Sequence, residues 1–419
     1  SWVINEIYQI YSREIFDVND IAFTEFLQII NQTTNIEFFQ SVYPELFEYF
    51  LEKFFDLLDK KSFGSSQPVV LTQFCFDIIK LPVNAKIYNP FAGLASFGVY
   101  APKKSEYKGQ EFSKQTWALG ILRLMAHNNF ESFEFTNANS ISDWAPYFYS
   151  TSKSSIERLT AYDKFERKHF DLVISNPPFG LKLPNEYVNE FGYNRTAESY
   201  FIDRGMDLLK EDGKLLAFVS DNFTFASGRE KQLRTKIIER DLLETIIHFP
   251  SGILKNASIP FSILILNKDK KLKQKVKLID ASKYLNGKRK RDLVIDYELL
   301  TKEVGKDYDT ISQRIVSNAE ILENHSKFTV DRYFIDKNFK EIENAIALNE
   351  LLEHYKGEKE IEKDLGIVVK VSDLSSKQNV EPLDISKIEN DIIKSEHRAI
   401  KESCLLIACK GNLLKPTFF

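Results

Sequence analysis

A length of 419 residues exceeds the usual size of one domain and predicts two or three structural units. A hydrophobic fraction of 43% excludes a disordered chain. The sequence contains no apolar run of about 18 or more residues, so nothing in it argues for a membrane-spanning helix. The formal net charge of −4 excludes the bulk charge typical of a nucleic-acid-binding protein, so any DNA affinity must come from local basic patches or from a partner.

Cysteines and histidines predict neither a disulfide framework nor a metal site. The chain has three cysteines, Cys75, Cys404 and Cys409, which are too few to form a disulfide framework in a protein of this length. A reducing cytoplasm is therefore the expected compartment. Neither they nor the six histidines show the spacing of metal ligands. The chain begins with Ser1 and ends inside an apolar pattern at Phe419, so both ends look cut.

Residues 1–62 are expected to form an N-terminal helical domain. Turn residues are scarce there, and apolar side chains recur at the spacing of an amphipathic helix: Phe26, Ile29, Ile30, Phe47, Phe50, Leu51, Phe54 and Leu58. The stretch 62–66 is the first clear break in this pattern.

Residues 63–300 are expected to form an α/β catalytic domain. Short apolar runs predict strands, and amphipathic segments between them predict helices at 113–127, 197–209 and 229–239. The predicted strands are 86–88, 171–175, 214–220, 245–249 and 261–266. This alternation favours a mostly parallel sheet covered on both faces, and the short spacer before the last strand favours an antiparallel last strand. Ligands bind beyond the carboxyl ends of such strands, here the loops 89–98, 111–113, 139–143 and 176–182.

Two of these loops suit a bound cofactor. Residues 89–98 follow a strand and carry small side chains, which let the backbone approach a ligand closely, and the helix that follows can face a carboxylate. A short strand at 107–111 ends in Glu111, whose carboxylate suits two ribose hydroxyls. A surface glutamate before a helix is the alternative interpretation.

The sharpest motif is Asn176-Pro177-Pro178-Phe179, directly after an apolar strand. The two prolines have fixed φ angles and no backbone N–H, so they form a rigid turn whose carbonyls are free to accept hydrogen bonds. The Asn176 amide oxygen and the Pro177 carbonyl would accept from an –NH₂ group while an electrophilic methyl approaches its nitrogen. Phe179 would stack on a planar substrate. The alternative is a proline turn that closes a strand, with Phe179 in the core.

Later segments predict surface patches, a connector and the start of another domain. Basic residues cluster at 268–277 and 288–291, where DNA-binding patches compete with a solvated strand edge and a loop as interpretations. Residues 301–365 look helical and charged, as expected of a connector. From Gly366 the pattern is strand-like, at 367–371 and 405–408, so 366–419 is expected to open a further domain.

The segments 89–97, 109–111 and 176–179 resemble gamma-class N6-adenine-specific DNA methyltransferases, in particular the modification subunits of type I restriction-modification systems. That family carries Asp-Pro-x-Cys-Gly-Ser-Gly, Gly-Gln-Glu and Asn-Pro-Pro-Phe, and the likeness covers residues 60–335. It implies a Rossmann-like class I methyltransferase sheet, S-adenosyl-L-methionine as cofactor, and an adenine flipped out of double-stranded DNA as substrate. Specificity and restriction subunits would be partners.

The resemblance also implies which residues act. Catalysis falls to Asn176, Pro177, Pro178 and Phe179. Cofactor binding falls to the segment before the sheet and to three loops: Gln67, Pro68, Asn89, Phe91, Ala92, Gly93, Glu111, Phe112, Asn139 and Ser140.

Three segments depart from the family pattern. Asn89 stands in place of the usual aspartate, with Ala92 and Ala95 in place of a cysteine and the second glycine. Residues 66–68 read Ser-Gln-Pro rather than Tyr-Thr-Pro, and residues 138–141 read Ala-Asn-Ser-Ile rather than Gly-Asp-Ser/Thr-Leu. Asp143 is a nearby substitute for the aspartate of that last segment.

Two other functions stay open. Asn-Pro-Pro-aromatic motifs also occur in methyltransferases that act on protein glutamines or on guanine amines of ribosomal RNA. The altered 89–95 loop would also fit a non-catalytic subunit that serves as a DNA-binding scaffold. The tail from Gly366 is similar to the start of a specificity-type target-recognition domain, which implies that recognition is partly fused to the methylase.

Overall fold

The chain divides into two compact units, Ser1–Ile335 and Asp336–Phe419. The computed structural model describes part of each unit. In the first unit it covers 43–49, 51, 67–127, 131–144, 169–184, 196–254, 259–287 and 294–334. In the second unit it covers 350, 353, 357, 365–374, 381–392, 398–401, 403–407 and 417–419.

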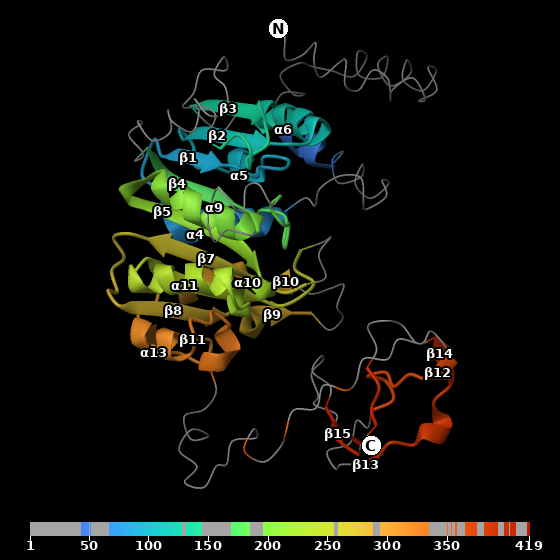
Figure 1. Cartoon of the computed structure of the whole chain (residues 1–419). Coiled ribbons are helices and arrows are strands. Elements are labelled where there is room, and N and C mark those ends of the chain that lie inside the picture. Colours follow the sequence, from blue (N-terminus) through green and yellow to red (C-terminus); the bar gives the residue numbers. More distant parts are fainter. Residues whose placement is uncertain are drawn as a thin grey trace, which may run out of the picture. The chain divides into compact units, whose positions relative to one another are not determined.

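A nine-stranded sheet in the order β11-β8-β6-β7-β5-β4-β1-β2-β3 forms the centre of the first unit (Figure 1). Strands β3, β2, β1, β4 and β5 run parallel to one another, and β8 runs parallel to β6. β7 lies antiparallel between β5 and β6, as the short spacer before it predicted. The strands are β1 (Lys86–Asn89), β2 (Glu106–Glu111), β3 (Ser132–Asn137), β4 (Phe170–Ser175), β5 (Leu209–Ser220), β6 (Leu243–Phe249), β7 (Phe261–Asn267), β8 (Lys275–Asp280) and β11 (Gln313–Ser317).

Helices cover both faces of this sheet because successive strand residues point to opposite sides. Ile87 and Leu172 belong to one apolar core, which they share with α4 (Val69–Ile79), α6 (Lys114–His127) and α12 (Tyr297–Val304). Tyr88 and Val173 belong to the other, with α9 (Ala197–Asp207), α11 (Arg229–Glu239) and α13 (Asn318–Glu323). Such a sheet, mostly parallel with β7 antiparallel between β5 and β6, is the Rossmann-like architecture that the sequence predicted. The short helices α5 (Ser96–Val99) and α10 (Asp221–Phe225) follow β1 and β5.

The segment after α12 differs from the helical connector expected at 301–365. Residues Gln313–Ser317 form β11, which pairs antiparallel with β8 and extends the sheet. The expectation is wrong for this segment, because Ile315 and Val316 are β-branched and Val316 packs into the sheet core. The two smaller strands β9 (Leu285–Asn286) and β10 (Val294–Ile295) pair with each other beside the main sheet.

The N-terminal region is described at 43–49, which is helical, and at Leu51. The other residues of the expected N-terminal helical domain lie outside the described part of the chain, as does the basic cluster 288–291. In the described residues, none of the helices has both the length and the apolarity to cross a membrane.

The second unit contains short strands. β12 (Leu365–Ile367) pairs antiparallel with β14 (Asn390–Ile392). A three-stranded sheet joins β13 (Glu381–Pro382), β16 (Thr417–Phe418) and β15 (Leu405–Leu406). The strands predicted at 367–371 and 405–408 are confirmed only in part, because β12 ends at Ile367 and β15 at Leu406. The predicted boundary at 366 and the recognition role remain predictions.

Candidate active site

The Asn-Pro-Pro-Phe loop, residues 176–179, begins where β4 ends. β4 is buried at Leu172, Val173 and Ile174, so the strand fixes the point at which Asn176 leaves the sheet. The Leu181 N–H donates to the Pro178 carbonyl at 3.2 Å, and Gly180 has φ +67°. A positive φ at the third residue of a four-residue turn is typical of a type II turn and favours glycine. The loop is therefore a tight turn, as the two prolines predicted.

A chain of hydrogen bonds orients the Asn176 side chain. The Thr72 hydroxyl donates to the Pro68 carbonyl at 3.2 Å and so accepts from Gln67 Nε2 at 2.8 Å. Gln67 Oε1 then faces Asn176 and accepts from Asn176 Nδ2 at 3.4 Å. This chain fixes the orientation of both amides, and among the described residues Asn176 Oδ1 accepts no hydrogen bond, so it can accept one from a ligand. Gln67, predicted to bind cofactor, thus also contacts the Asn-Pro-Pro-Phe loop.

Phe179 is half-buried and stacks on an aromatic layer. Its ring lies 6.3 Å from the Phe261 ring at an interplanar angle of 26°. Phe261 in turn stacks on Phe249 at 4.9 Å and on Phe218 at 5.6 Å. This layer fixes one face of the Phe179 ring, so the ring is both part of the core edge and partly exposed to a ligand.

The β1 loop, residues 90–95, packs against the end of β2. The Ala92 N–H donates to the Gln110 carbonyl at 2.8 Å, and the Gly93 N–H donates to Glu111 Oε2 at 3.0 Å. Gly93 has φ +53° and nothing lies within 4 Å of where a Cβ would stand. Ala95 also has a positive φ, +56°, where the resembled family has glycine. The loop therefore leaves open space over Gly93 beside a carboxylate.

Glu111 is held at the carboxyl end of β2 by backbone groups. Its Oε1 accepts from the Ser113 N–H at 2.7 Å, while Oε2 takes the bond from Gly93. Each oxygen keeps a second lone pair for a ligand hydroxyl. Burial raises the pKa of Glu111 above its ordinary value, although hydrogen bonds from Ser113, Gly93 and Phe112 oppose the shift.

Asn89 and Ser175 tie the β1 loop to the Asn-Pro-Pro-Phe loop. Asn89 is fully buried, donates to the Tyr107 hydroxyl at 3.2 Å and accepts from the Ser175 hydroxyl at 3.2 Å. The Phe91 N–H donates to Ser175 Oγ at 3.2 Å. Both polar atoms of the Asn89 side chain are thus engaged inside the protein, and the two predicted site loops are joined by one hydroxyl.

The loop after β3 closes this cluster. Ser140 donates to the Pro90 carbonyl, and Asn139 Oδ1 accepts from the Ile141 N–H at 2.9 Å. Gln110 joins Tyr88 to the Asp143 carbonyl through its side-chain amide. Phe112 is 73% exposed, so its ring is available to an adjacent ligand. The structure therefore brings all the predicted site segments to one edge of the sheet.

Sequence reasoning missed two further residues at this edge. Ser175 is the hydroxyl link described above, and Glu198 accepts hydrogen bonds from Gly180 and Ser220. No local motif marks either residue, because a serine ending a strand and a glutamate opening a helix are ordinary choices. In the part of the chain that the structure describes, no group of three metal-ligating side chains occurs.

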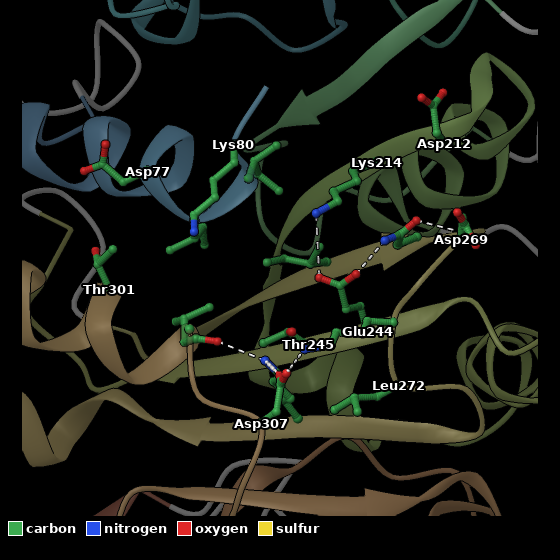
Figure 2. Close-up of a pocket in the computed structure, with 18 residues that line it drawn as sticks. Asp77, Lys80, Asp212, Lys214, Glu244, Thr245, Asp269, Leu272, Thr301 and Asp307 are labelled. Atoms are coloured by element: carbon green, nitrogen blue, oxygen red, sulfur yellow. Dashed lines mark hydrogen bonds and ion pairs between the residues drawn. The ribbon is translucent and has the colours of Figure 1, made fainter. Parts of the chain in front are cut away.

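The basic cluster 268–277 lies at the opposite edge of the sheet, beside a cavity of about 510 Å³ (Figure 2). Lys271 and Lys277 both pair with Asp307, at 2.5 and 2.7 Å, and Lys214 faces Glu244 at 3.9 Å. The buried Lys270 pairs with Asp241 at 2.5 Å. Carboxylates neutralise these lysines at the amino ends of β5, β6 and β8. The interpretation of the cluster as a solvated strand edge therefore fits better than its interpretation as a DNA-binding patch.

Comparison with known proteins identifies one family. A family model described as N-6 DNA Methylase matches residues 40–342. This match includes every residue of the edge described above.

Curated relatives carry the same kind of name. The methylase subunit of the type I restriction enzyme MjaIX of Methanocaldococcus jannaschii is 25% identical over 78% of this chain and 61% of the relative. The HindI methylase subunit of Haemophilus influenzae is 24% identical over 65% of this chain and 60% of the relative. The MpnII methylase subunit of Mycoplasma pneumoniae is 21% identical over 64% of this chain and 49% of the relative. The chain thus spans about half to three fifths of the length of these relatives.

Solved structures share the fold. The methyltransferase subunit of a type I restriction-modification system from Streptococcus thermophilus has a TM-score of 0.56 and 22% identity, covering 70% of this chain and 64% of that one. A modification subunit of a putative type I restriction enzyme from Vibrio vulnificus has a TM-score of 0.54 and 15% identity, over 66% and 60% of the two chains.

Proposed function

This chain belongs to the N-6 DNA methylase family, and we propose that it transfers a methyl group from S-adenosylmethionine to the N6 amine of adenine in DNA. The transfer would serve modification in a restriction-modification system. The observation that carries the proposal is the oriented Asn176 amide, whose Oδ1 is left free at the carboxyl edge of the sheet by its bond to Gln67.

The residues at this edge fit S-adenosylmethionine. The open space over Gly93 allows a ligand to lie on the backbone of the β1 loop, and Glu111 presents two carboxylate oxygens beside it. Glu111 would hold the ribose hydroxyls, Phe112 and the Asn139–Ser140 turn would flank the adenine ring, and Gln67, Pro68 and the β1 loop would hold the methionine end. When bound, this cofactor supplies an electrophilic methyl group on a sulfonium sulfur.

Asn176 and Pro177 would position the target amine. The Asn176 Oδ1 and the Pro177 carbonyl each accept a hydrogen bond from one N–H of the amine, which turns the nitrogen lone pair toward the methyl donor. Two accepted hydrogen bonds also stabilise the positive charge that develops on the amine during direct displacement. The proton then leaves to solvent, and no covalent enzyme intermediate is needed.

Phe179 would bind the face of the target base. An adenine amine inside a duplex cannot reach this edge, so the nucleotide must be flipped out of the stack, at a cost of a few kcal/mol. Stacking on an aromatic ring offsets part of that cost, about 1–3 kcal/mol per base. The Phe261 layer beneath Phe179 holds that ring ready for the base.

We also propose the partners and the division of labour along the chain. The catalytic domain begins at residue 63, follows an N-terminal helical domain at 1–62 and extends past residue 300 to include β11 (Gln313–Ser317), while 366–419 opens a target-recognition domain. Specificity and restriction subunits would act with it on double-stranded DNA, in the cytoplasm, where the free thiols of Cys75 and Cys404 persist. The family and the names of the relatives favour DNA over a protein glutamine or an RNA guanine.

Transfer of a labelled methyl group tests this function. The full-length protein is incubated with labelled S-adenosylmethionine and with DNA, RNA or a glutamine peptide, in parallel with Asn176→Ala. We expect label in DNA alone, a loss of at least about 100-fold in the variant, and unchanged cofactor binding by calorimetry. Equal transfer by Asn176→Ala would overturn the assignment. A wild-type protein that binds no cofactor would favour the scaffold function.

A further inference from the structure

Glu198 is a buried carboxylate that bridges two loops at the candidate active site. It lies in the first turn of α9 and is 1% exposed. Its Oε2 accepts from the Gly180 N–H at 3.1 Å, and its Oε1 accepts from the Ser220 N–H at 2.7 Å. Gly180 directly follows the Asn-Pro-Pro-Phe loop, and Ser220 is the last residue of the adjacent strand β5.

Burial of the Glu198 carboxylate has a free-energy cost that its contacts must offset. A buried carboxylate loses its hydration, and among the described residues no cation forms an ion pair with Glu198. Two charge-assisted hydrogen bonds and the positive end of the α9 dipole offset that loss. A capping box between Thr196 and Ser199 fixes the start of the same helix and therefore the position of the carboxylate.

The Asn-Pro-Pro-Phe loop has few other means of anchorage. Pro177 and Pro178 have no N–H, so their backbone cannot be tied down by donated hydrogen bonds. The bond between Asn176 and Gln67 holds the start of the loop, at 3.4 Å. The Gly180 N–H, at the other end, is held by Glu198. The Ala197 N–H also donates to the Leu181 carbonyl at 2.8 Å, so a backbone hydrogen bond joins α9 to the segment that directly follows the loop.

We propose that Glu198 is a positioning residue for methyl transfer, which fixes the Asn-Pro-Pro-Phe loop against the end of β5. The inference rests on the proposed function of that loop. Through Gly180 the carboxylate sets the height of Phe179 and of the Pro177 carbonyl above the sheet edge. Through the hydrogen bond from the Ser220 N–H it fixes this position relative to the neighbouring strand, β5. It contacts neither base nor cofactor, so its effect falls on the rate of transfer.

Glu198→Gln is the sharpest variant because it keeps the shape of the side chain. Its amide oxygen can accept from one of the two N–H groups, but its NH₂ then faces the other donor. Glu230→Gln is the matched control. Glu230 occupies the same helical position in α11, is also buried at 9% exposure, and forms no hydrogen bond with either loop in the described part of the chain.

Steady-state kinetics and hydrogen exchange of the full-length protein test the proposal together. For Glu198→Gln we expect kcat for DNA methylation to fall about ten- to a hundredfold, the cost of a misplacement of about 1 Å. The Kd of S-adenosylmethionine by calorimetry should stay within about twofold, because a lost transition-state contact leaves ground-state binding unchanged. Exchange at Gly180 and Ser220 should rise, and Glu230→Gln should change none of these quantities.

Two outcomes overturn the positioning role. One is wild-type kcat in Glu198→Gln although exchange at Gly180 rises. The other is unchanged exchange at both amides. Failure of the proposed function is separate: a wild-type protein that methylates no DNA removes that function, while the exchange measurement still decides whether Glu198 anchors the loop.

Discussion

At the scale of single residues, the carboxylate of Glu111 makes cofactor affinity depend on pH. Burial raises its pKa, so it becomes protonated at a pH where an exposed glutamate is still ionised. The ionised form accepts charge-assisted hydrogen bonds from both ribose hydroxyls, whereas the protonated form has no charge and one oxygen that has become a donor, so it binds the hydroxyls more weakly. Affinity for S-adenosylmethionine should therefore fall as pH is lowered through the raised pKa.

Calorimetry over a range of pH checks this prediction. Glu111→Gln should weaken binding about ten- to a hundredfold at neutral pH, since a charge-assisted hydrogen bond contributes about 1.5–3 kcal/mol, and should flatten the pH profile. Glu106→Gln, at the other end of the same strand, is the control and should bind as the wild type does. A wild-type profile that is flat in the acid range would contradict the role of Glu111.

The β1 loop makes a second prediction at this scale. Ala95 and Gly93 both have positive φ angles, and nothing crowds the Cβ position of Gly93. Gly93→Ala should therefore lower the free energy of unfolding by about 1 kcal/mol through backbone strain alone, and Ala95→Gly should cost nothing or stabilise by up to about 1 kcal/mol. Urea denaturation measures both, and a clear loss for Ala95→Gly would refute the strain argument.

Sequence reasoning at this scale found residues with local patterns and missed those with distant partners. Asn176 and Glu111 were predicted because each follows a strand in a recognisable motif. Glu198 was missed because its partners, Gly180 and Ser220, lie 18 and 22 residues away. The engagement of Asn89 with Tyr107 and Ser175 was likewise invisible to local pattern.

At the scale of elements, the helical segment 43–49 docks on α6 through a buried ion pair. Arg123 is 1% exposed and binds Glu48 at 2.6 and 2.9 Å, and it also donates to the Leu94 carbonyl and the Ser96 hydroxyl. His127 lies 2.9 Å from the same carboxylate. Arg123 therefore connects the N-terminal region to the β1 loop and the start of α5.

This ion pair should stabilise the fold in a pH-dependent manner. Burial acts to raise the pKa of Glu48, but hydrogen bonds from His127 and Arg123 outweigh it and lower the pKa to about 2. A depressed pKa contributes stability above the unfolded value and loses it as pH falls from about 4.5 toward 2. Glu48→Gln should cost about 2–3 kcal/mol near neutrality, and the difference from wild type should shrink in acid. Urea unfolding at several pH values measures it, and a cost independent of pH would contradict this account.

Most of the sheet could be predicted from hydrophobic periodicity, and its far end could not. The strands β1, β4, β5, β6 and β7 each contain a short run of apolar residues that is buried in the sheet, and these runs predicted them. β8 begins among lysines and the edge strand β11 begins with Gln313, so polar residues interrupt the apolar pattern of both strands. The sequence also did not predict β3, the strand at the other edge. Pairing between residues that are 34 to 42 positions apart cannot be inferred from local composition.

At the scale of the whole molecule, charged side chains are distributed differently at the amino ends and at the carboxyl ends of the parallel strands. The lysines at the amino edge are paired with carboxylates, as Figure 2 shows for Lys214, Glu244 and Asp307. The ends of the strands that carry the site loops instead present backbone donors and acceptors and the Glu111 carboxylate. If it acts on DNA as proposed, a chain with a formal net charge of −4 would need partners or basic regions outside the catalytic sheet to bind the phosphates.

The central claim is methylation of adenine in DNA through Asn176. The most direct measurement is single-molecule sequencing of DNA from a methylation-free host that expresses the full-length gene together with the specificity subunit proposed as its partner, beside the same host carrying Asn176→Ala. The account predicts methylated adenine at a discrete sequence motif in the first host and none in the second. Methylated adenine that persists with Asn176→Ala, or its absence from both hosts, would contradict the account.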